Sequence, residues 1–231
     1  MARLKHKVGS AFMSQFVLRI GKLVIGLFIA AIGIILTIRA EVGYSPWDVL
    51  HVGLANTVGL SLGTVAVVVG ACVVLLATML GETLGIGTLL NMLLIGVFMD
   101  VIIWSGFIPQ ASSGIMSAGM LAIGMVILAI GMYFYISSGF GAGPRDSLMV
   151  AVHRKTNLPI GICRGGIELV ATIIGYGLGG LVGIGTIITA VLIGPIVQVV
   201  FRLVHFDPRA IVHERLSETI KRVKHPRPVN T

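Results

Sequence analysis

Charged residues are scarce in this chain. Asp, Glu, Lys and Arg make up 11% of its 231 residues, whereas hydrophobic residues make up 56%. A soluble domain carries about 25% charged residues, because its surface must be solvated. The mean hydropathy of +1.01 is correspondingly high. The composition therefore excludes a soluble enzyme and a nucleic-acid-binding domain, and it indicates a protein of the lipid bilayer.

Cysteine is also rare, and no arrangement of residues suggests catalysis or metal binding. The two cysteines, Cys72 and Cys163, fall in or beside apolar segments, where they read as small packing residues. Disulfide frameworks and zinc sites need several cysteines or histidines at fixed spacings. No Ser/His, metal-ligand or paired-acid motif is present in the sequence. We therefore expect no metal, no cofactor and no enzyme activity.

Long uncharged runs fill most of the chain, and each approaches or exceeds the ~20 residues that a helix needs to cross a bilayer. The longest, 169–201, is divided by glycines between 175 and 185, where a tight turn fits. The predicted fold is therefore an all-α membrane protein with six transmembrane helices. They lie at about 18–38, 62–80, 86–107, 116–137, 160–178 and 184–204.

The basic residues are distributed very unevenly between the predicted loops. With the N-terminus inside, the cytoplasmic segments are 1–22, 81–85, 138–164 and 202–231, and they contain 16 of the 17 Lys and Arg residues. Arg39 is the exception. Cytoplasmic loops of membrane proteins carry such an excess of positive charge. We therefore expect a multi-pass protein of the cytoplasmic membrane with both termini inside.

The chain repeats itself at a distance of 98 residues. Without a gap, 25–96 aligns with 123–194, and 23 of the 72 aligned positions are identical. Matched Gly, Pro and Asp residues carry this signal, because apolar matches between two spans arise by chance. Each unit holds three spans, and an odd number places two tandem units in opposite orientations. We thus expect two inverted three-helix repeats, 23–108 and 116–204, between a basic N-terminal segment (1–22) and a basic tail (205–231).

One repeated motif follows the first span of each unit. It is Gly-x-x-Pro-x-Asp, at 43–48 and again at 141–146. Proline at the first helical position and aspartate in the first turn favour a helix start, so we expect short helices at about 47–57 and 145–156. One interpretation is a pair of re-entrant half-helices whose N-termini point inward toward a polar or anionic solute. The other is a pair of helices that lie on the membrane surface.

A second repeated motif opens the third span of each unit. Gly-Ile-Gly-Thr occurs at 85–88 and at 183–186. Glycines let helix backbones approach closely, and a threonine can bond an earlier carbonyl, so we expect a role in helix packing. An alternative is that the two threonines line a solute path. The residues concerned are Gly85, Gly87, Thr88, Gly183, Gly185 and Thr186.

A few ionisable residues fall at membrane depth, where charges are costly and usually functional. Arg164 precedes Glu168 by one turn on the same helix face, where an ion pair can form. That pair is either part of a solute site or a structural contact. Asp100, near the outer end of the third span, is either a ligand or an interfacial residue. The candidate binding residues are Ser45, Pro46, Asp48, His51, Asn91, Asp100, Pro144, Arg145, Asp146, Arg164 and Glu168.

The C-terminal tail is strongly basic. Asp207 and Pro208 begin a predicted helix over 207–224 that has an irregular apolar stripe. A basic amphipathic helix suits the anionic cytoplasmic leaflet. We expect the tail to lie against that surface.

Four motifs in order resemble a known family, the YczE-like bacterial integral membrane proteins, which are grouped with the YitT and YyaS types. The motifs are Gly-Tyr-Ser-Pro-Trp-Asp-Val-Leu at 43–50, Gly-Ile-Gly-Thr-Leu-Leu-Asn at 85–91, Gly-Ala-Gly-Pro-Arg-Asp at 141–146 and Gly-Ile-Gly-Thr at 183–186. The resemblance extends from about residue 20 to residue 204. It implies a bacterial protein of the cytoplasmic membrane, and it carries over no functional residues.

These features favour a small permease or channel that moves a small polar or anionic solute. Its site would lie at the repeat interface, between Pro46 and Pro144. No nucleotide-binding motif occurs, so transport would use a coupling ion or a separate ATPase. Two alternatives stay open: a substrate-binding subunit that docks on an ATPase module, and a non-transport scaffold or regulatory protein. The expected partners are the lipid bilayer, a small solute and a coupling ion, without nucleic acid; a homo-oligomer is left open.

Overall fold

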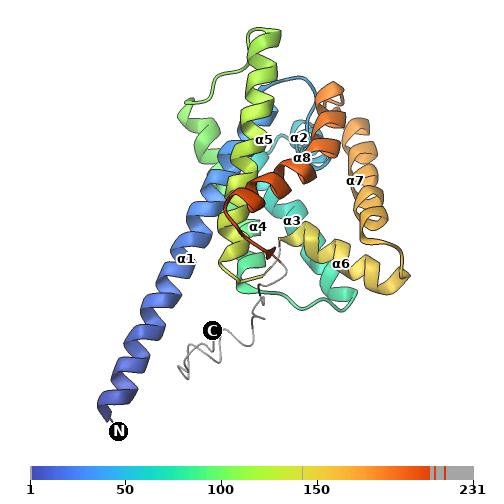
Figure 1. Ribbon diagram of the computed structural model, residues 1–231. Coiled ribbons are helices and arrows are strands. Elements are labelled where there is room, and N and C mark those ends of the chain that lie inside the picture. Colours follow the sequence, from blue (N-terminus) through green and yellow to red (C-terminus); the bar gives the residue numbers. More distant parts are fainter. Residues whose placement is uncertain (1, 142, 209–210, 212–215, 217–231) are drawn as a thin grey trace.

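In the computed structural model (Figure 1), the chain forms eight helices over the residues that are described, 2–141, 143–208, 211 and 216. They are α1 (Ala2–Arg39), α2 (Pro46–Val58), α3 (Leu62–Met79), α4 (Ile86–Ser105), α5 (Gly114–Ser137), α6 (Pro144–Thr156), α7 (Ile160–Gly177) and α8 (Ile184–Leu203). All except α2 and α6 are long and apolar enough to cross a membrane, α1 over Met13–Arg39. The six predicted spans are confirmed, and apart from the start of α1 their ends agree within two residues.

The helix boundaries recur at a fixed distance along the chain. Helices α2, α3 and α4 begin and end 98 residues before α6, α7 and α8, and α5 ends 98 residues after α1. This is the spacing of the sequence repeat. Each unit therefore consists of three long helices and one short helix that follows the first of them.

Two long helices, α1 and α5, cross at the centre of the molecule (Figure 1). They run antiparallel, because Gly26 lies against Gly131 while Gly33 lies against Gly124. A Cβ atom at either position of α1 would collide with the backbone of α5. Glycine thus lets the two helices approach more closely than larger side chains would allow.

The other helices pack around this central pair. Helix α4 packs on α1 and α3, and α8 packs on α5. The short helix α2 packs mainly on α7, and the short helix α6 packs mainly on α3. Each short helix therefore lies on a long helix of the other unit, which ties the two units together.

The loops gather at two ends of the bundle. At one end, Glu82 of the α3–α4 loop pairs with Arg154 at 3.1 Å, and α1 begins at this end as well (Figure 1). At the other end, the Gln110 amide donates a hydrogen bond of 2.6 Å to Glu41. The described parts of the predicted cytoplasmic segments 1–22, 81–85 and 138–164 therefore reach the same end. The tail helix predicted over 207–224 lies largely outside the described residues.

The two Gly-Ile-Gly-Thr motifs pack on non-helical backbone rather than on another helix. Gly87 donates its N–H to the carbonyl oxygen of Phe140 at 2.8 Å, and Gly185 donates to Val42 at 2.7 Å. A Cβ at Gly87 would collide with the Phe140 carbonyl. The close approach expected at these glycines occurs, and its partner is the non-helical segment before each short helix. The carbonyl groups of that segment are not used in a helix and can accept the glycine N–H groups.

Candidate functional site

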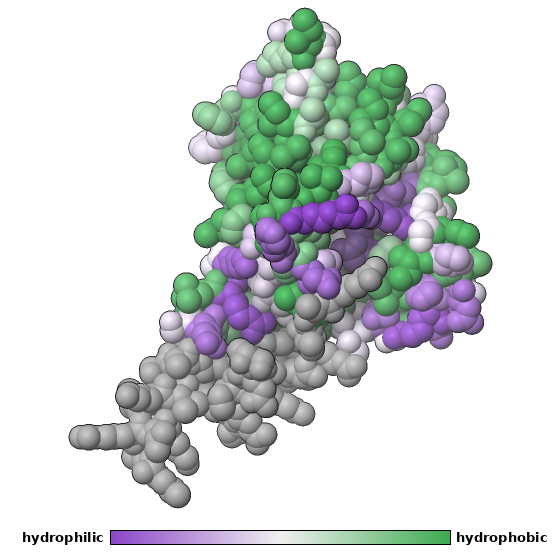
Figure 2. All heavy atoms as spheres, in the orientation of Figure 1, coloured by the Kyte–Doolittle hydropathy of each residue, from purple (hydrophilic) through white to green (hydrophobic). Residues whose placement is uncertain are grey.

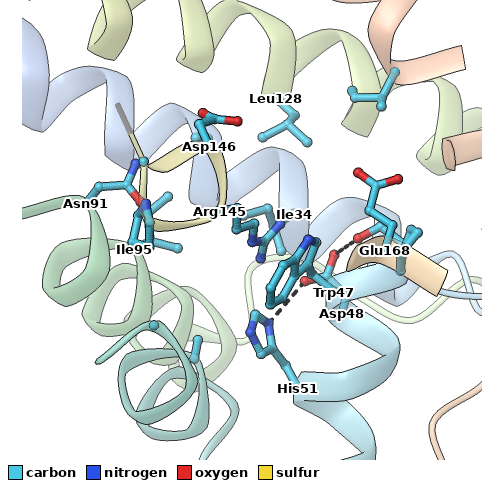
Figure 3. Close-up of a pocket in the computed structure, with 18 of the residues that line it drawn as sticks. Ile34, Trp47, Asp48, His51, Asn91, Ile95, Leu128, Arg145, Asp146 and Glu168 are labelled. Carbon is cyan, nitrogen blue, oxygen red and sulfur yellow. Dashed lines mark hydrogen bonds and ion pairs between the residues drawn. The ribbon is translucent and has the colours of Figure 1, made fainter. Parts of the chain in front are cut away.

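A cavity of about 210 Å³ lies among the helices, and all eight contribute to its lining. Ribbons of several elements converge on it in Figure 3. Much of the wall is apolar, and five methionines contribute to it: Met92, Met99, Met125, Met132 and Met149. Polar and charged side chains come mainly from the first turns of α2 and α6 and from one face of α7. The cavity therefore combines a flexible apolar wall with a compact group of charges.

Both short helices begin at this cavity and end far from it. Pro46 and Pro144 each occupy the first turn of their helix and line the cavity. The far end of α2 is held by Thr57, whose hydroxyl donates to the Leu178 carbonyl at 3.2 Å. The far end of α6 is held at the opposite end of the bundle through Arg154. The two N-termini, which carry partial positive charge, thus approach the cavity from opposite ends.

The start of α2 contains a buried polar cluster. Asp48 and His51 are 3% and 4% exposed. The Ser45 hydroxyl donates to one carboxylate oxygen of Asp48 at 2.5 Å, and the other oxygen lies 3.5 Å from His51 Nδ1. Among the described residues, that oxygen and Nδ1 have no hydrogen-bond partner. The cluster therefore retains two polar atoms that a proton, a water molecule or a solute group could satisfy.

The start of α6 places a cation over an aromatic ring. The Arg145 guanidinium lies 5.0 Å from the centre of the Trp47 ring (Figure 3). Such a cation–π contact contributes roughly 0.5–2 kcal/mol, depending on how far the cation is removed from water. Asp48, Asp146 and Glu168 also attract the Arg145 charge. Arg145 is therefore the positive centre of a group of carboxylates, and Arg164 is a second cation at the edge of the cavity.

The predicted ion pair on α7 is present at the edge of the cavity. Arg164 Nε donates to Glu168 Oε1 at 2.9 Å. The Arg164 side chain is 48% exposed and the Glu168 side chain 18%. Glu168 thus points its carboxylate toward the cavity, while Arg164 extends to the outside.

Ten of the eleven candidate residues line this one cavity, although they come from four helices and the Ser45 cap of α2. They are Ser45, Pro46, Asp48, His51, Asn91, Pro144, Arg145, Asp146, Arg164 and Glu168. Whether they bind a solute stays a prediction. Thr88 and Thr186 are buried outside the lining, so the alternative of a solute path along these threonines is not supported.

Asp100 lies elsewhere, at the N-terminus of α3. Its carboxylate accepts hydrogen bonds from the Gly63 N–H at 2.7 Å and from the Ser61 hydroxyl at 2.5 Å. Carboxylates at helix N-termini satisfy free N–H groups and oppose the helix dipole. Asp100 thus caps α3 and lies outside the cavity lining, and whether it also binds a solute stays a prediction.

Several lining residues escaped the sequence analysis. Trp47 could have been predicted, because the repeat aligns it with Arg145. It was not, because the candidate residues were chosen mainly for ionisable and polar side chains. Tyr135 and the five methionines gave no signal, since an apolar residue in a span looks the same whether it faces lipid, a neighbouring helix or a cavity. Within the described residues, no three His, Cys, Asp or Glu side chains gather closely enough to bind a metal ion.

Comparison with known proteins gives a family and several relatives. Residues 17–202 match the model of a family described as a family of unknown function, DUF6198. The chain is 39% identical over 175 residues to the uncharacterized membrane protein YczE of Bacillus subtilis, covering 75% of this chain and 80% of that protein. It is 33% identical over 187 residues to an uncharacterized protein of Haemophilus influenzae, covering 79% and 85%, and 28% identical over 191 residues to YyaS of Bacillus subtilis, covering 79% and 92%. No solved structure matches.

Proposed function

The chain belongs to the DUF6198 family of multi-pass membrane proteins, and we propose that it is a small permease that moves a small polar or anionic solute across the cytoplasmic membrane. In this proposal, two three-helix units of opposite orientation enclose the central cavity. The observation that carries it is the meeting of two helix N-termini, one from each unit, at a buried charged cavity. Transporters built from inverted repeats bind their solutes at such a place.

The contacts between the two units support the inverted arrangement. A twofold operation that exchanges the units converts the contact between Gly26 and Gly131 into that between Gly124 and Gly33, and both contacts occur. The same operation converts the Gly87–Phe140 hydrogen bond into the Gly185–Val42 hydrogen bond, and both occur as well. Because α1 and α5 run antiparallel, a twofold axis that exchanges them must be roughly perpendicular to both helices. An axis in the membrane plane is the arrangement expected for two units with odd numbers of spans.

The short helices fit the role of half-helices that present backbone N–H groups to a solute. Each begins with a proline that has no N–H of its own, which leaves the next amides of the first turn as available donors. Together with Arg145 they favour a negatively charged or hydrogen-bond-accepting group. Asp48, Asp146 and Glu168 would hold a donor or positive group of the same solute. The cavity volume of about 210 Å³ limits the solute to a small molecule.

The positive-inside distribution supports an orientation with both termini in the cytoplasm. In the sequence, 16 of the 17 basic residues fall in the predicted cytoplasmic segments, and the described parts of these segments where Glu82 pairs with Arg154 and where α1 begins lie at one end of the bundle. In this orientation α2 enters the membrane from the outside and α6 from the inside. Extended backbone at membrane depth is tolerated where it is buried in protein or lines a cavity, and Ser45 and Gly143 both line the cavity.

The test is binding followed by uptake. Purified protein would be heated in detergent with a panel of small carboxylates, phosphate, sulfate and amino acids, and compounds that raise the Tm would be tested as labelled solutes in proteoliposomes without any partner protein. Saturable uptake supports the proposal. Binding without uptake would favour the subunit that docks on an ATPase, and the absence of both would favour a scaffold.

Cysteine labelling locates the site independently. In a background that lacks Cys72 and Cys163, single cysteines at Ser45 and Gly143 should react with a small charged thiol reagent, position 45 from outside and position 143 from inside. A bound solute should protect at least one of them. Free reaction at both positions with no protection would contradict a site between the two helix N-termini.

A further inference from the structure

Two helix pairs that occupy equivalent places in the two units differ in their packing. Helices α3 and α4 pack closely, and they cross at Gly63 and Gly96. A Cβ atom on either glycine would collide with the carbonyl oxygen of the other. Asp100 of α4 adds the 2.7 Å hydrogen bond to the Gly63 N–H. This pair is therefore closed along its length.

Helices α7 and α8 have the same glycines but do not pack on each other. The residues 98 positions beyond Gly63 and Gly96 are Gly161 and Gly194. A Cβ atom added to either would meet nothing within 4 Å. Gly161 is exposed, whereas Gly63 is buried. The two glycines that would allow a close crossing are thus present in α7 and α8, but the crossing is not made.

The parted helices form one mouth of the cavity. Gly70 meets Met92 between α3 and α4, and the equivalent positions between α7 and α8 are Glu168 and Ala190. All four residues line the cavity. Gly70 and Met92 close the cavity wall between α3 and α4, whereas the Arg164 side chain extends outward where α7 and α8 are apart. Figure 2 shows a hollow with hydrophilic residues on the face where α8 and α7 lie in Figure 1. Charged side chains at membrane depth face a water-filled cavity rather than lipid, so the opening between α7 and α8 would be filled with water.

We propose that α7 and α8 close onto each other through Gly161 and Gly194, and that the two helix pairs close in turn. The inference rests on the proposed permease function, and it adds the gates of that same cavity. When α7 and α8 are apart the cavity opens between them, and when they meet α3 and α4 separate on the other side. Two states that interchange equivalent contacts differ little in free energy, which is the condition for both to be populated.

The sequence of α8 supports bending at this point. Pro195 follows Gly194 inside the helix. A proline within a helix removes one backbone hydrogen bond and permits a kink. The equivalent residue of α4 is Val97, which makes no such interruption. Helix α8 can therefore change its course beside the glycine that the proposed contact uses.

Disulfide formation tests the closure without knowledge of the solute. In the background without native cysteines, Gly70→Cys with Met92→Cys probes α3 and α4, and Glu168→Cys with Ala190→Cys probes the equivalent places in α7 and α8. A Cβ at position 70 would lie 3.6 Å from the Met92 Cβ, within the range for a disulfide. The first pair should oxidise fully and quickly. The second should oxidise more slowly but to high yield, because each closure would be trapped.

A chain with all four cysteines tests whether the pairs alternate. After oxidation, the free thiols would be alkylated and the intact mass of each molecule measured. Alternation predicts one disulfide per molecule, either 70–92 or 168–190, and two alkylated thiols. Molecules with both disulfides would show that the pairs close independently, and a complete absence of the 168–190 disulfide would show that α7 and α8 stay apart. Either result overturns the proposal.

Gly194→Val supplies a variant that is compatible with the present structure. A Cβ added at Gly194 meets nothing within 4 Å, so the Tm should change little. The valine should nevertheless block the crossing with Gly161 and lower the yield of the 168–190 disulfide at least tenfold. Gly161→Val should act in the same way. Unchanged 168–190 yields in both variants would contradict closure through these glycines.

The disulfide and uptake results separate this proposal from the permease function. Alternating disulfides without solute uptake would refute the permease function and support the alternating closure of the helix pairs. Solute uptake without the 168–190 disulfide would support the permease function and refute the closure.

Discussion

Arg145 lies over the indole ring of Trp47, the residue at the same position of the other unit, with its guanidinium carbon 5.0 Å from the ring centre. The two residues follow Pro144 and Pro46, so the contact joins the first turns of the two short helices. An arginine and a tryptophan cannot be exchanged without changing the charge of the cavity. The cavity is therefore chemically asymmetric although the helices around it repeat.

Removing the Arg145 charge should destabilise the protein in a pH-dependent way. In Arg145→Gln, the carboxylates of Asp48 and Asp146 stay in the same cavity without their positive neighbour. We expect a loss on the order of 2 kcal/mol at pH 8, below the 3–5 kcal/mol of a fully buried pair because Arg145 is partly exposed. At about pH 3 the loss should be smaller, because Asp48, whose pKa in the folded protein lies below its ordinary value, begins to take up a proton there. Thermal unfolding in detergent at both pH values measures this, and an equal loss at both would contradict the electrostatic cause.

Glu168 should matter for solute binding, whereas a similar ion pair elsewhere should not. Glu168→Gln is expected to remove most of the Tm increase produced by a binding solute and to lower uptake, while expression stays near normal. Glu82→Gln is the matched control, because Glu82 pairs with Arg154 at 3.1 Å and its side chain is 15% exposed, close to the 18% of Glu168. If the two variants behave alike, the Arg164–Glu168 pair is only structural.

The central crossing of α1 and α5 should depend on glycine at the contact points alone. Gly33→Ala is expected to lower stability by about 1–3 kcal/mol, since its Cβ would meet the backbone at Gly124 and Leu128. Gly21→Ala on the same helix meets nothing within 4 Å and should be neutral or slightly stabilising. Thermal unfolding of both variants gives the comparison. Equal stability of the two would show that α1 and α5 do not approach as closely as described.

Asp100 should contribute to stability and leave solute binding unchanged. Asp100→Ala removes the acceptor of the Gly63 N–H, and the loss of a helix cap costs about 1 kcal/mol. Gln198→Ala, at the equivalent position of α8, changes an exposed side chain and should have little effect. Solute affinity measured on both variants decides the role, and a large loss of affinity in Asp100→Ala alone would return Asp100 to the binding site.

The orientation in the membrane is open to a direct test. Alkaline phosphatase fused after Gly106 should be active, because this loop is expected outside, whereas a fusion after His205 should be inactive. A fusion of a cytoplasmic reporter at the same two points should give the opposite pattern. Phosphatase activity at His205 would reverse the topology and would place Ser45 on the cytoplasmic side.

The long helices and the short helices could be predicted well because each has a local cause. A run of uncharged residues specifies a span by its length, and proline with aspartate at 46 and 48 or at 144 and 146 specifies a helix start. The pair Arg164–Glu168 followed from spacing along one helix. These features depend on neighbours in the chain, and the sequence contains them in full.

The arrangement around the cavity could be predicted only in part. The repeat predicted that Pro46 and Pro144 lie at one site, and both line the cavity. A repeat relates residues that are far apart in the chain, so it can predict such a contact. The contact of Asp100 with the start of α3 could not be predicted, because its partners Ser61 and Gly63 belong to another element of the chain. The parting of α7 from α8 left no trace in the sequence, since their glycines match those of the closed pair α3 and α4.

The contacts between the two units also determine when the protein can fold. Gly26 and Gly33 pack on residues made about a hundred positions later, which at 5–20 residues per second means a delay of roughly 5–20 s during synthesis. During that interval the glycine face of α1 stays unmatched, and once α4 has been made the Gly87 N–H also waits for its acceptor, Phe140. Lipid or the insertion machinery has to shield them until α5 and Phe140 emerge. The first unit alone is therefore a nascent intermediate rather than a domain.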